Sequence, residues 1–287
     1  MTDFGANQRI VFVNDSAGSH TDVPKCLQAF KRCDIADAAD VLPPLLTISS
    51  DASQLLVAVW GGDGSIRSVA ARLVDSQATL LACPGGTHNH FCRQLGMSNE
   101  ADVAAALTSG AVRHLDVGKV GPEIFLNNLS IGWYTDLVYR RVRYEAHMPR
   151  RLAKATSLAV QLFRTRRLRL VIDGTPERTW LFWAGNGEYA TTPARLNERE
   201  SLDQGVLDVR LLRAGTRWPK VRALIALARK NTESSPLVDR RVIPSTSVNA
   251  RQRTLQATLD GELISLNTPL QITVGRGSLR VLTPVNP

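Results

Sequence analysis

The sequence predicts two domains of different class, an α/β domain followed by an all-β domain. Up to residue 118, short apolar β-type runs alternate with segments of helical spacing, which is typical of a parallel sheet covered by helices. From residue 119 onward, short segments that alternate apolar and polar residues dominate, and Gly, Asp and Asn turns join them. We therefore expect domains at 1–118 and 119–275, with the tail 276–287 packing back on the first domain.

The first domain contains the expected pieces of a parallel sheet. Its strands are apolar along their whole length, as in sheets that are covered on both faces. Pro24 stands where a helix would begin, and Gly110 stands where one would end. We expect strands at 9–14, 54–60 and 78–84. We expect helices at 24–32, 66–76 and 100–110, and a further helix that follows the GGTHNHF stretch and ends at about residue 95.

The second domain is predicted to be mainly antiparallel. Two basic amphipathic segments, at about 150–164 and 220–229, are expected to be helical. The remaining strand-like segments read EIFLNNLSIG, LRLVIDG, TWLFWAGN, GVLDVRLLRA, TLQATLDGELI, LQITVG and LRVLTP.

The composition is that of a globular protein kept in a reducing compartment. Hydrophobic residues make up 44% of the 287 residues, and no apolar run approaches the roughly 20 residues that span a bilayer. The N-terminal stretch lacks the basic and apolar regions of a secretory signal. Four scattered cysteines without C-x-x-C spacing favour free thiols over disulfides or a zinc site. We expect a cytoplasmic protein.

Positive charge is concentrated in one segment, residues 140–169. This segment holds ten basic residues and one acid, Glu145, and the whole chain has a net charge of +9. A localised basic surface attracts anions such as lipid headgroups, nucleic acid or phosphorylated substrates. A solvated helix face is the simpler alternative.

Two glycine-rich turns, GGDGS at 61–65 and GGTHN at 85–89, follow strands of the predicted sheet. Glycines let backbone N–H groups approach phosphate oxygens, and the start of a following helix adds positive charge. Neither turn fits a Walker A motif or a dinucleotide fingerprint. Two such turns in one sheet favour a phosphate or nucleotide site over turns that serve packing alone.

Two acidic positions accompany these turns. A carboxylate beside phosphate, here Asp63, is repulsive unless a cation intervenes or a proton must be moved, and both conditions occur in phosphoryl transfer. A turn or helix cap explains Asp63 equally well. A second acidic turn, TLDGE at 258–262, also carries the Asp-Gly signal of a hairpin.

The order of these motifs resembles the diacylglycerol kinase catalytic-domain family of soluble lipid kinases, which includes bacterial diacylglycerol kinases, sphingosine kinases and ceramide kinases. The matching segments are VNDSAGS (13–19), GGDGS, PGGTHNHFCRQLG (84–96), LDVGKV with FLNNLSIGWY, LDQGVLDV (202–209) and LDGE. The likeness covers nearly the full length, and the NHF form is similar to a less-studied bacterial branch.

The resemblance implies a nucleotide-binding α/β domain, a β-sandwich-like domain, and an active site in the cleft between them. It also implies ATP as co-substrate, with Mg²⁺. The positions that would hold ATP are Asn14, Gly18, Gly61, Gly62, Asp63, Gly64, Ser65, Gly86, Thr87 and Asn89. Arg67 could reach phosphate from the first helical turn, and a solvated helix arginine is the alternative.

The resemblance also assigns the acids. Asp260 or Glu262 would take the proton from the lipid hydroxyl, and the sequence does not choose between them. Asp63 and Asp116 would help to organise magnesium and phosphate, and Asp203 in LDQG is a further metal candidate.

Several positions depart from the family pattern. His90 stands where an acid is common, Gln204 replaces the second acid of D-D-G, and Arg67 with Ser68 change the first glycine motif. Mg²⁺ prefers oxygen ligands, so His90 is a poor replacement for a metal-ordering aspartate.

The leading hypothesis is therefore an ATP-dependent lipid kinase that acts on a hydroxyl of diacylglycerol, ceramide or a related lipid. The basic segment would dock it peripherally on the inner face of an anionic membrane. The alternatives are another kinase on the same scaffold, such as an NAD kinase, and a nucleotide- or lipid-binding regulator without catalysis. Nucleic-acid binding ranks last, because no recognised motif accompanies the charge.

Overall fold

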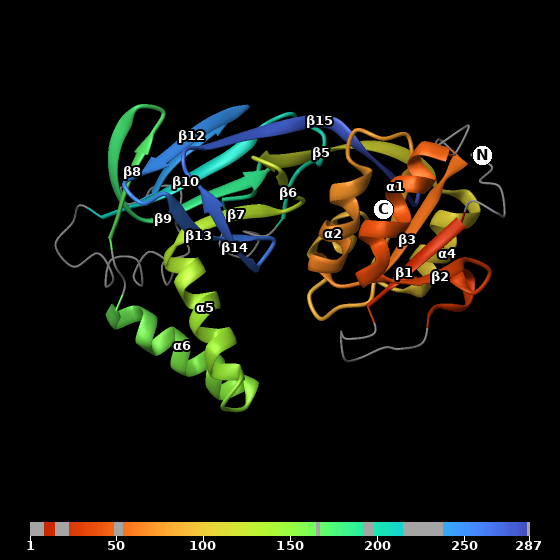
Figure 1. Ribbon diagram of the computed structural model, residues 1–287, viewed down its shortest axis with the longest axis horizontal. Helices are drawn as coiled ribbons and strands as arrows, with labels where there is room; N and C mark the ends of the chain where they lie inside the picture. Colours follow the sequence, from red (N-terminus) through yellow and green to blue (C-terminus); the bar gives the residue numbers. More distant parts are fainter. Residues whose placement is uncertain are drawn as a thin grey trace. The chain divides into compact units, whose positions relative to one another are not determined.

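The computed structural model describes residues 9–14, 23–48, 54–164, 167–191, 198–214 and 238–285. The chain divides into two compact units. Unit 1 comprises Met1–Val117 and Gly275–Pro287, and unit 2 is Gly118–Val274. Two long strands, β5 (Ala111–Val120) and β15 (Leu270–Thr283), run through both units. Figure 1 shows an α/β layer in unit 1 and mainly strands in unit 2, which confirms the predicted α/β plus all-β class.

Unit 1 is built on a parallel sheet in the order β2-β1-β3-β4-β15. The C-terminal part of β15 pairs with β4 through Arg280 and Val281. All six residues of β3 are buried, as the continuous apolar run predicts for a strand with both faces covered. The other strands of this sheet are β1 (Arg9–Val13), β2 (Lys31–Asp34), β3 (Leu56–Gly61) and β4 (Thr79–Pro84).

Helices cover this sheet. α2 packs on β3 and β4, and α4 packs on β4. In α4, a capping box between Asn99 and Asp102 satisfies free N–H groups at the first turn, and the helix ends before Gly110. The helices of unit 1 are α1 (Ala38–Ile48), α2 (Asp63–Leu73), α3 (His90–Gln94) and α4 (Glu100–Ser109).

One local prediction for unit 1 is wrong. Residues 24–32 form a 3₁₀ turn at Lys25–Leu27 and then enter the edge strand β2, rather than a helix. The pairing of β2 with β1 outweighs the weak helical pattern. No element was predicted for the stretch that forms helix α1, which contains Pro43 and Pro44.

Unit 2 is antiparallel, as predicted, and its main strand order is β14-β13-β7-β9-β8-β12-β15. β10 pairs with both β9 and β11. Its core is a continuous apolar cluster that includes Phe125, Phe182 and Val248. The strands are β6 (Glu123–Phe125), β7 (Asn128–Gly132), β8 (Leu168–Ile172), β9 (Thr175–Asn186), β10 (Leu207–Arg213), β11 (Val238–Ile243), β12 (Ser245–Ala250), β13 (Thr254–Leu259) and β14 (Glu262–Asn267).

A helical hairpin extends from the strands of unit 2 (Figure 1). It consists of α5 (Trp133–Glu145) and α6 (Arg150–Arg164), so the predicted basic helix at 150–164 is present. α5 contacts β7, β9, β13 and β14, and the main partner of α6 is α5. The helix expected at 220–229 lies outside the described residues.

A surface helix normally packs its apolar side on the rest of its domain, but two large apolar side chains of α6 are exposed. Leu152 is 58% exposed and Leu158 is 46% exposed. The side of α6 that is buried carries the small residues Ala153 and Ser157, which allow close approach to a neighbouring helix. The side chains of Leu162 and Phe163 are outside the described residues.

Candidate functional site

Three loops of unit 1 start at the same edge of the parallel sheet. Val13, at the end of β1, pairs with Trp60 in β3. Gly61, at the end of β3, pairs with Pro84 at the end of β4. The carboxyl ends of parallel strands are where open α/β sheets bind ligands. The predicted glycine turns therefore lie next to each other at a suitable edge.

The two glycine turns touch through their backbones. The N–H of Gly85 donates to the carbonyl oxygen of Gly61 at 3.1 Å. A Cβ atom added to Gly86 would lie 2.4 Å from the Cα of Gly62, which no side chain tolerates. Position 86 must therefore be glycine for the two turns to lie this close. The two turns contact each other through backbone atoms.

Helix α2 begins directly behind the first turn, with Gly62 as its N-cap and Asp63 as its first residue. The first N–H groups of a helix have no partner within the helix and carry partial positive charge. Asn14 braces this turn, because its side-chain amide donates to the hydroxyl of Ser65 at 2.9 Å. The start of α2 therefore offers backbone donors in a fixed position. Gly18, predicted for the same site, lies outside the described residues.

Asp63 joins the two loops. Its carboxylate accepts the N–H of His90 at 3.1 Å and the N–H of Phe91 at 3.0 Å. These are the first N–H groups of α3, so the Asp63 side chain caps α3, the helix that follows the second glycine turn. Asp63 is also the first residue of α2, the helix that follows the first turn. The capping role that the sequence allowed is present, and a role toward metal or phosphate stays a prediction.

The second turn is closed by Asn89, which adopts left-handed backbone with φ 48°. Its side-chain oxygen accepts the N–H of Gly86 at 2.9 Å, and its side-chain amide donates to the Gly86 carbonyl at 2.7 Å. Asparagine tolerates this conformation better than most residues. Thr87 lies exposed at the tip of the turn, and Arg67 is half-buried in α2.

His90 differs chemically from the acid that the family pattern would place there. Burial lowers its pKa more than the nearby Asp63 carboxylate raises it, so the ring is neutral near pH 7. The guanidinium of Arg93 lies 3.2 Å from Nδ1 of His90, and because arginine only donates, Nδ1 accepts. The His90 ring also stacks on His88 with centroids 5.6 Å apart.

The two predicted metal residues have different surroundings. Asp116 is buried in β5, and its carboxylate accepts the N–H of Gly277 at 2.8 Å. This contact ties β5 to β15 within unit 1. Asp203 is exposed in unit 2, and its carboxylate accepts the hydroxyl of Ser201.

The acidic turn of unit 2 is a tight hairpin. Asp260 and Gly261 join β13 to β14 with φ angles of 51° and 88°, the two positive values typical of a type I′ turn. The Asp260 carboxylate accepts three backbone N–H groups, from Leu126 at 2.8 Å, Asn127 at 2.7 Å and Asn128 at 2.9 Å. A carboxylate offers about four acceptor positions, so at most one of them remains. Glu262 follows at the start of β14 with an exposed side chain.

Sequence reasoning missed two further side chains, Arg199 and Tyr189, that bind the backbone carbonyl groups of the segment 126–128. Arg199 donates to the carbonyl oxygens of Leu126 at 2.8 Å and Asn186 at 2.6 Å. Its guanidinium lies 5.3 Å from the centre of the Tyr189 ring. The Tyr189 hydroxyl donates to the Asn127 carbonyl at 2.9 Å, and burial raises its pKa to about 12. The NNLSIG motif pointed to this segment, but nothing in the polar stretch around Arg199 did.

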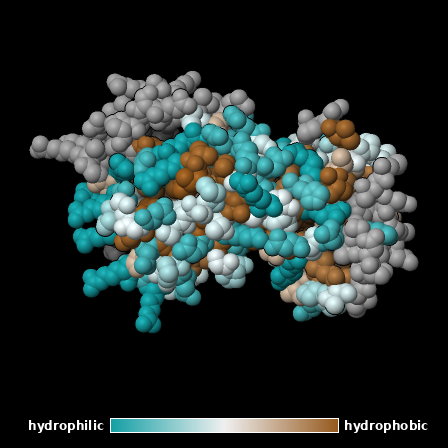
Figure 2. Space-filling view, turned by 90° about the horizontal axis from the view of Figure 1, so that it is seen from above, coloured by the Kyte–Doolittle hydropathy of each residue, from teal (hydrophilic) through white to brown (hydrophobic). Residues whose placement is uncertain are grey.

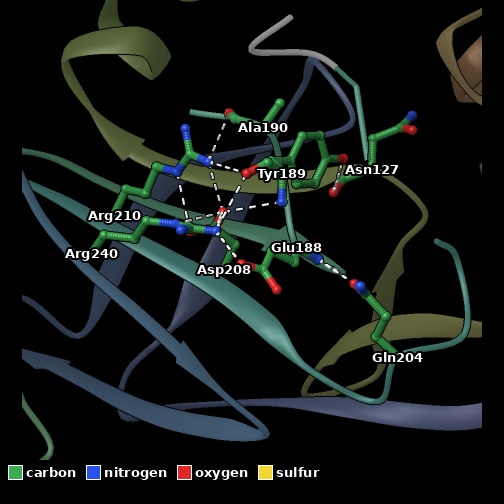
Figure 3. A network of polar contacts seen from close by, with 8 residues as sticks. All are labelled: Asn127, Glu188, Tyr189, Ala190, Gln204, Asp208, Arg210 and Arg240. Carbon is green, nitrogen blue, oxygen red and sulfur yellow. Dashed lines mark hydrogen bonds and ion pairs between the residues drawn. The ribbon is translucent and has the colours of Figure 1, made fainter. Parts of the chain in front are cut away.

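A buried ionic network supports the segment that carries Tyr189 (Figure 3). Asp208 lies in β10, and its side chain is fully buried. It accepts from Arg210 at 2.7 Å, from Arg240 at 3.1 Å and from the N–H of Tyr189 at 3.1 Å. Burial opposes the charge of Arg240, but the hydrogen bonds and charges of Asp208 and Glu188 raise its pKa on balance.

Gln204 has a structural contact in the same region. Its side-chain oxygen accepts the N–H of Glu188 at 2.8 Å (Figure 3). A glutamine therefore serves here as a hydrogen-bond acceptor, at the position where the family pattern often has an acid.

The described residues contain no group of three or more His, Cys, Asp or Glu side chains that could hold a metal ion. Burial raises the pKa values of the Cys83 and Cys92 thiols, which disfavours the thiolates that metals require. Mg²⁺ at nucleotides is commonly held by one or two carboxylates together with substrate phosphates. A metal role for Asp63, Asp116 or Asp203 stays a prediction.

Comparison with known proteins agrees with the resemblance read from the motifs. Residues 8–120 match the diacylglycerol kinase catalytic domain. This confirms the resemblance drawn from the motifs.

Relatives extend the likeness beyond that domain. A "Probable lipid kinase YegS-like" of Pseudomonas aeruginosa PAO1 is 29% identical over 233 residues, covering 78% of this chain and 75% of the relative. A diacylglycerol kinase of Bacillus subtilis strain 168 is 39% identical over 88 residues, 29% of each chain. A crystal structure of a diacylglycerol kinase from Bacillus anthracis has a TM-score of 0.65 at 22% identity, covering 96% of this chain and 97% of that one. The last likeness concerns the fold alone.

Proposed function

We propose that this protein is an ATP-dependent lipid kinase that transfers the γ-phosphate of ATP to the hydroxyl of a membrane lipid such as diacylglycerol or ceramide. One observation carries the proposal. The glycine turns after β3 and β4 contact each other at the ligand-binding edge of a diacylglycerol kinase catalytic domain, and Asp63 joins them.

Unit 1 would bind the nucleotide. Backbone N–H groups at the start of α2 and in the second turn suit the phosphate oxygens, because both loops are held by hydrogen bonds before ligand arrives. Bound Mg²⁺ would neutralise charge on the triphosphate, with Asp63, Asp116 and Asp203 as candidate carboxylates. The residues proposed to contact ATP are Asn14, Gly61, Gly62, Asp63, Gly64, Ser65, Arg67, Gly86, Thr87 and Asn89.

Unit 2 would supply the general base. The lipid hydroxyl oxygen forms a bond to the γ-phosphorus, the bond from that phosphorus to the β–γ bridging oxygen breaks, and ADP leaves. The hydroxyl proton must pass to a carboxylate. We assign this role to Glu262, since three backbone donors already occupy Asp260. Asp260 would then fix the turn that presents Glu262.

The substrate of such an enzyme lies in a membrane. The described residues include no helix long and apolar enough to cross one. We propose peripheral association through the basic segment 140–169, because each Lys or Arg near an anionic leaflet contributes about 1 kcal/mol.

The test is transfer of γ-labelled phosphate from ATP into chloroform-extractable lipid, with diacylglycerol and ceramide offered separately in mixed micelles. We expect labelled lipid phosphate from the wild-type protein. Glu262→Gln should lower kcat by about 10²–10⁴-fold, the usual contribution of a general base, without changing the KM for ATP. Glu177→Gln is the matched control, because Glu177 is a carboxylate of unit 2 that makes two long ion pairs, of 3.7 and 3.8 Å.

Other outcomes would redirect the proposal. A water-soluble labelled product would favour another kinase on this scaffold, such as an NAD kinase. ATP binding without transfer to any lipid would favour a regulator that lost catalysis, an alternative motivated by the departures from the family pattern at Arg67, Ser68 and His90.

A further inference from the structure

Helix α6 exposes several of its described apolar residues to solvent. Leu152 and Leu158 are 58% and 46% exposed, and Ala155 and Ala159 between and beside them are exposed too. At 100° per residue these four positions share one side of the helix. A surface helix of a globular protein normally buries such a side.

The opposite side of α6 is occupied by small residues. Ala153 and Ser157 are buried, and the Ser157 hydroxyl donates to the Ala153 carbonyl within the helix. α5 is the main partner of α6. Within the part of the chain that the structure describes, Leu152 and Leu158 therefore stay exposed while α6 packs on α5, and their side of the helix is available to another partner.

The second helix of the hairpin, α5, also exposes large apolar side chains. Tyr139 and Val142 of α5 are 54% and 51% exposed. Of the nine large hydrophobic residues that are exposed in the described part of the chain, five belong to the hairpin. The five are Tyr134, Tyr139, Val142, Leu152 and Leu158. The face drawn in Figure 2 shows hydrophobic residues in separate patches among hydrophilic ones.

Charge identifies the kind of partner. Residues 133–164 contain seven basic residues and two acids, Asp136 and Glu145, which is a net charge of 7 − 2 = +5. Arg143 and Arg151 are exposed beside the apolar positions. A second copy of the same basic hairpin would be repelled from this face. An anionic lipid surface satisfies both the positive charge and the apolar side chains.

We propose that the α5–α6 hairpin inserts the apolar side of α6, with Tyr139 and Val142, below the headgroups of an anionic membrane. With 15 residues α6 is about 22 Å long, too short to span a bilayer, so it lies in the plane of the interface. The arginines contact lipid phosphates. This inference rests on the proposed function, because a lipid kinase must reach a substrate in the membrane. It adds the insertion of named apolar side chains to the adsorption by charge proposed above.

The test compares binding of the full chain to vesicles of phosphatidylcholine with 30% phosphatidylglycerol by co-sedimentation. The double variant Leu152→Gln/Leu158→Gln should bind at least tenfold more weakly than wild type. The matched control is Val171→Gln/Val242→Gln, whose valines are 38% and 40% exposed on strands. This control should bind like wild type. Pure phosphatidylcholine vesicles should bind much less of every variant.

Salt separates insertion from adsorption. At 0.5 M NaCl the charge attraction is screened, yet wild type should retain measurable binding and the double Gln variant should lose it. Leu158→Trp should show an additional blue-shifted emission that brominated acyl chains quench. Equal binding of the double variant and wild type, or no quenching at position 158, overturns the proposal. Self-association that depends on Leu152 and Leu158 without vesicle binding would also overturn it, in favour of a second copy.

A separate experiment tests the kinase proposal independently of membrane insertion. Turnover of a short-chain diacylglycerol below its micelle concentration by the wild-type protein tests the chemistry without a membrane. Vesicle binding through the hairpin without any lipid phosphorylation would retain the docking proposal and reject the kinase.

Discussion

Replacing Asp208 by asparagine should destabilise unit 2 strongly while keeping the shape of the side chain. The Asp208 side chain is fully buried, and the side chains of Arg210 and Arg240 are only 16% and 30% exposed. Both guanidinium groups donate to this one carboxylate, as does the backbone of Tyr189. An asparagine side chain at this position could not neutralise either arginine, and its NH₂ group cannot accept from them.

The expected magnitude follows from the burial of this network. Breaking a buried ion pair by removing one partner costs about 3–5 kcal/mol, because an uncompensated charge remains. Both arginines are partly exposed and regain some hydration, so we expect the lower end, about 3 kcal/mol. Urea unfolding at pH 7, followed by fluorescence and circular dichroism, measures the loss.

Asp239→Asn provides the matched control on the neighbouring strand. Asp239 lies in β11 and pairs with Arg213 at 2.9 Å and Arg241 at 2.8 Å, but these arginines are 50% and 35% exposed. Exposed pairs contribute about 0–1 kcal/mol. If Asp208→Asn loses less than about 1 kcal/mol, or no more than Asp239→Asn, the network does not support unit 2 in the way described.

Three further changes are expected. Gly86→Ala should raise the KM for ATP at least tenfold in a label-transfer assay, because a Cβ 2.4 Å from the Cα of Gly62 separates the two loops; an unchanged KM would contradict the assigned phosphate site. Asp63→Asn should lower the free energy of unfolding by about 1–2 kcal/mol in thermal or urea unfolding, since the start of α3 loses its charged acceptor. For Tyr189, burial raises the folded-state pKa to about 12 from an ordinary value near 10, so stability present below pH 10 is lost as pH rises toward 12, by about 3 kcal/mol. Urea unfolding of Tyr189→Phe at pH 8 to 12 should show a flatter decline than wild type, and parallel declines would refute the assignment.

The sequence predicted the parts of the structure that depend on strong local patterns. Buried strands such as β3 are apolar throughout, and the glycine turns mark close backbone contacts that few other residues permit. The antiparallel turn at Asp260 was readable from its Asp-Gly pair. These signals lie within a few residues of one another.

Features that depend on distant contacts were not predictable. The edge strand β2 is mostly exposed and has no apolar run, so only its pairing with β1 defines it. Arg199 gains its role from carbonyl groups up to 73 residues away. The outward apolar side of α6 has the same local pattern as a buried one, and only its packing on α5 distinguishes the two.

The central claim is that the two glycine turns hold the ATP phosphates and that Glu262 takes the proton from the lipid hydroxyl. A crystal structure of the protein with Mg²⁺, a non-hydrolysable ATP analogue and a short-chain diacylglycerol tests it most directly. We predict phosphate oxygens on the N–H groups of the turns at 61–65 and 85–89, and the Glu262 carboxylate within about 3 Å of the lipid hydroxyl or one water away. Phosphates bound elsewhere, or a Glu262 carboxylate remote from the hydroxyl, would contradict the account.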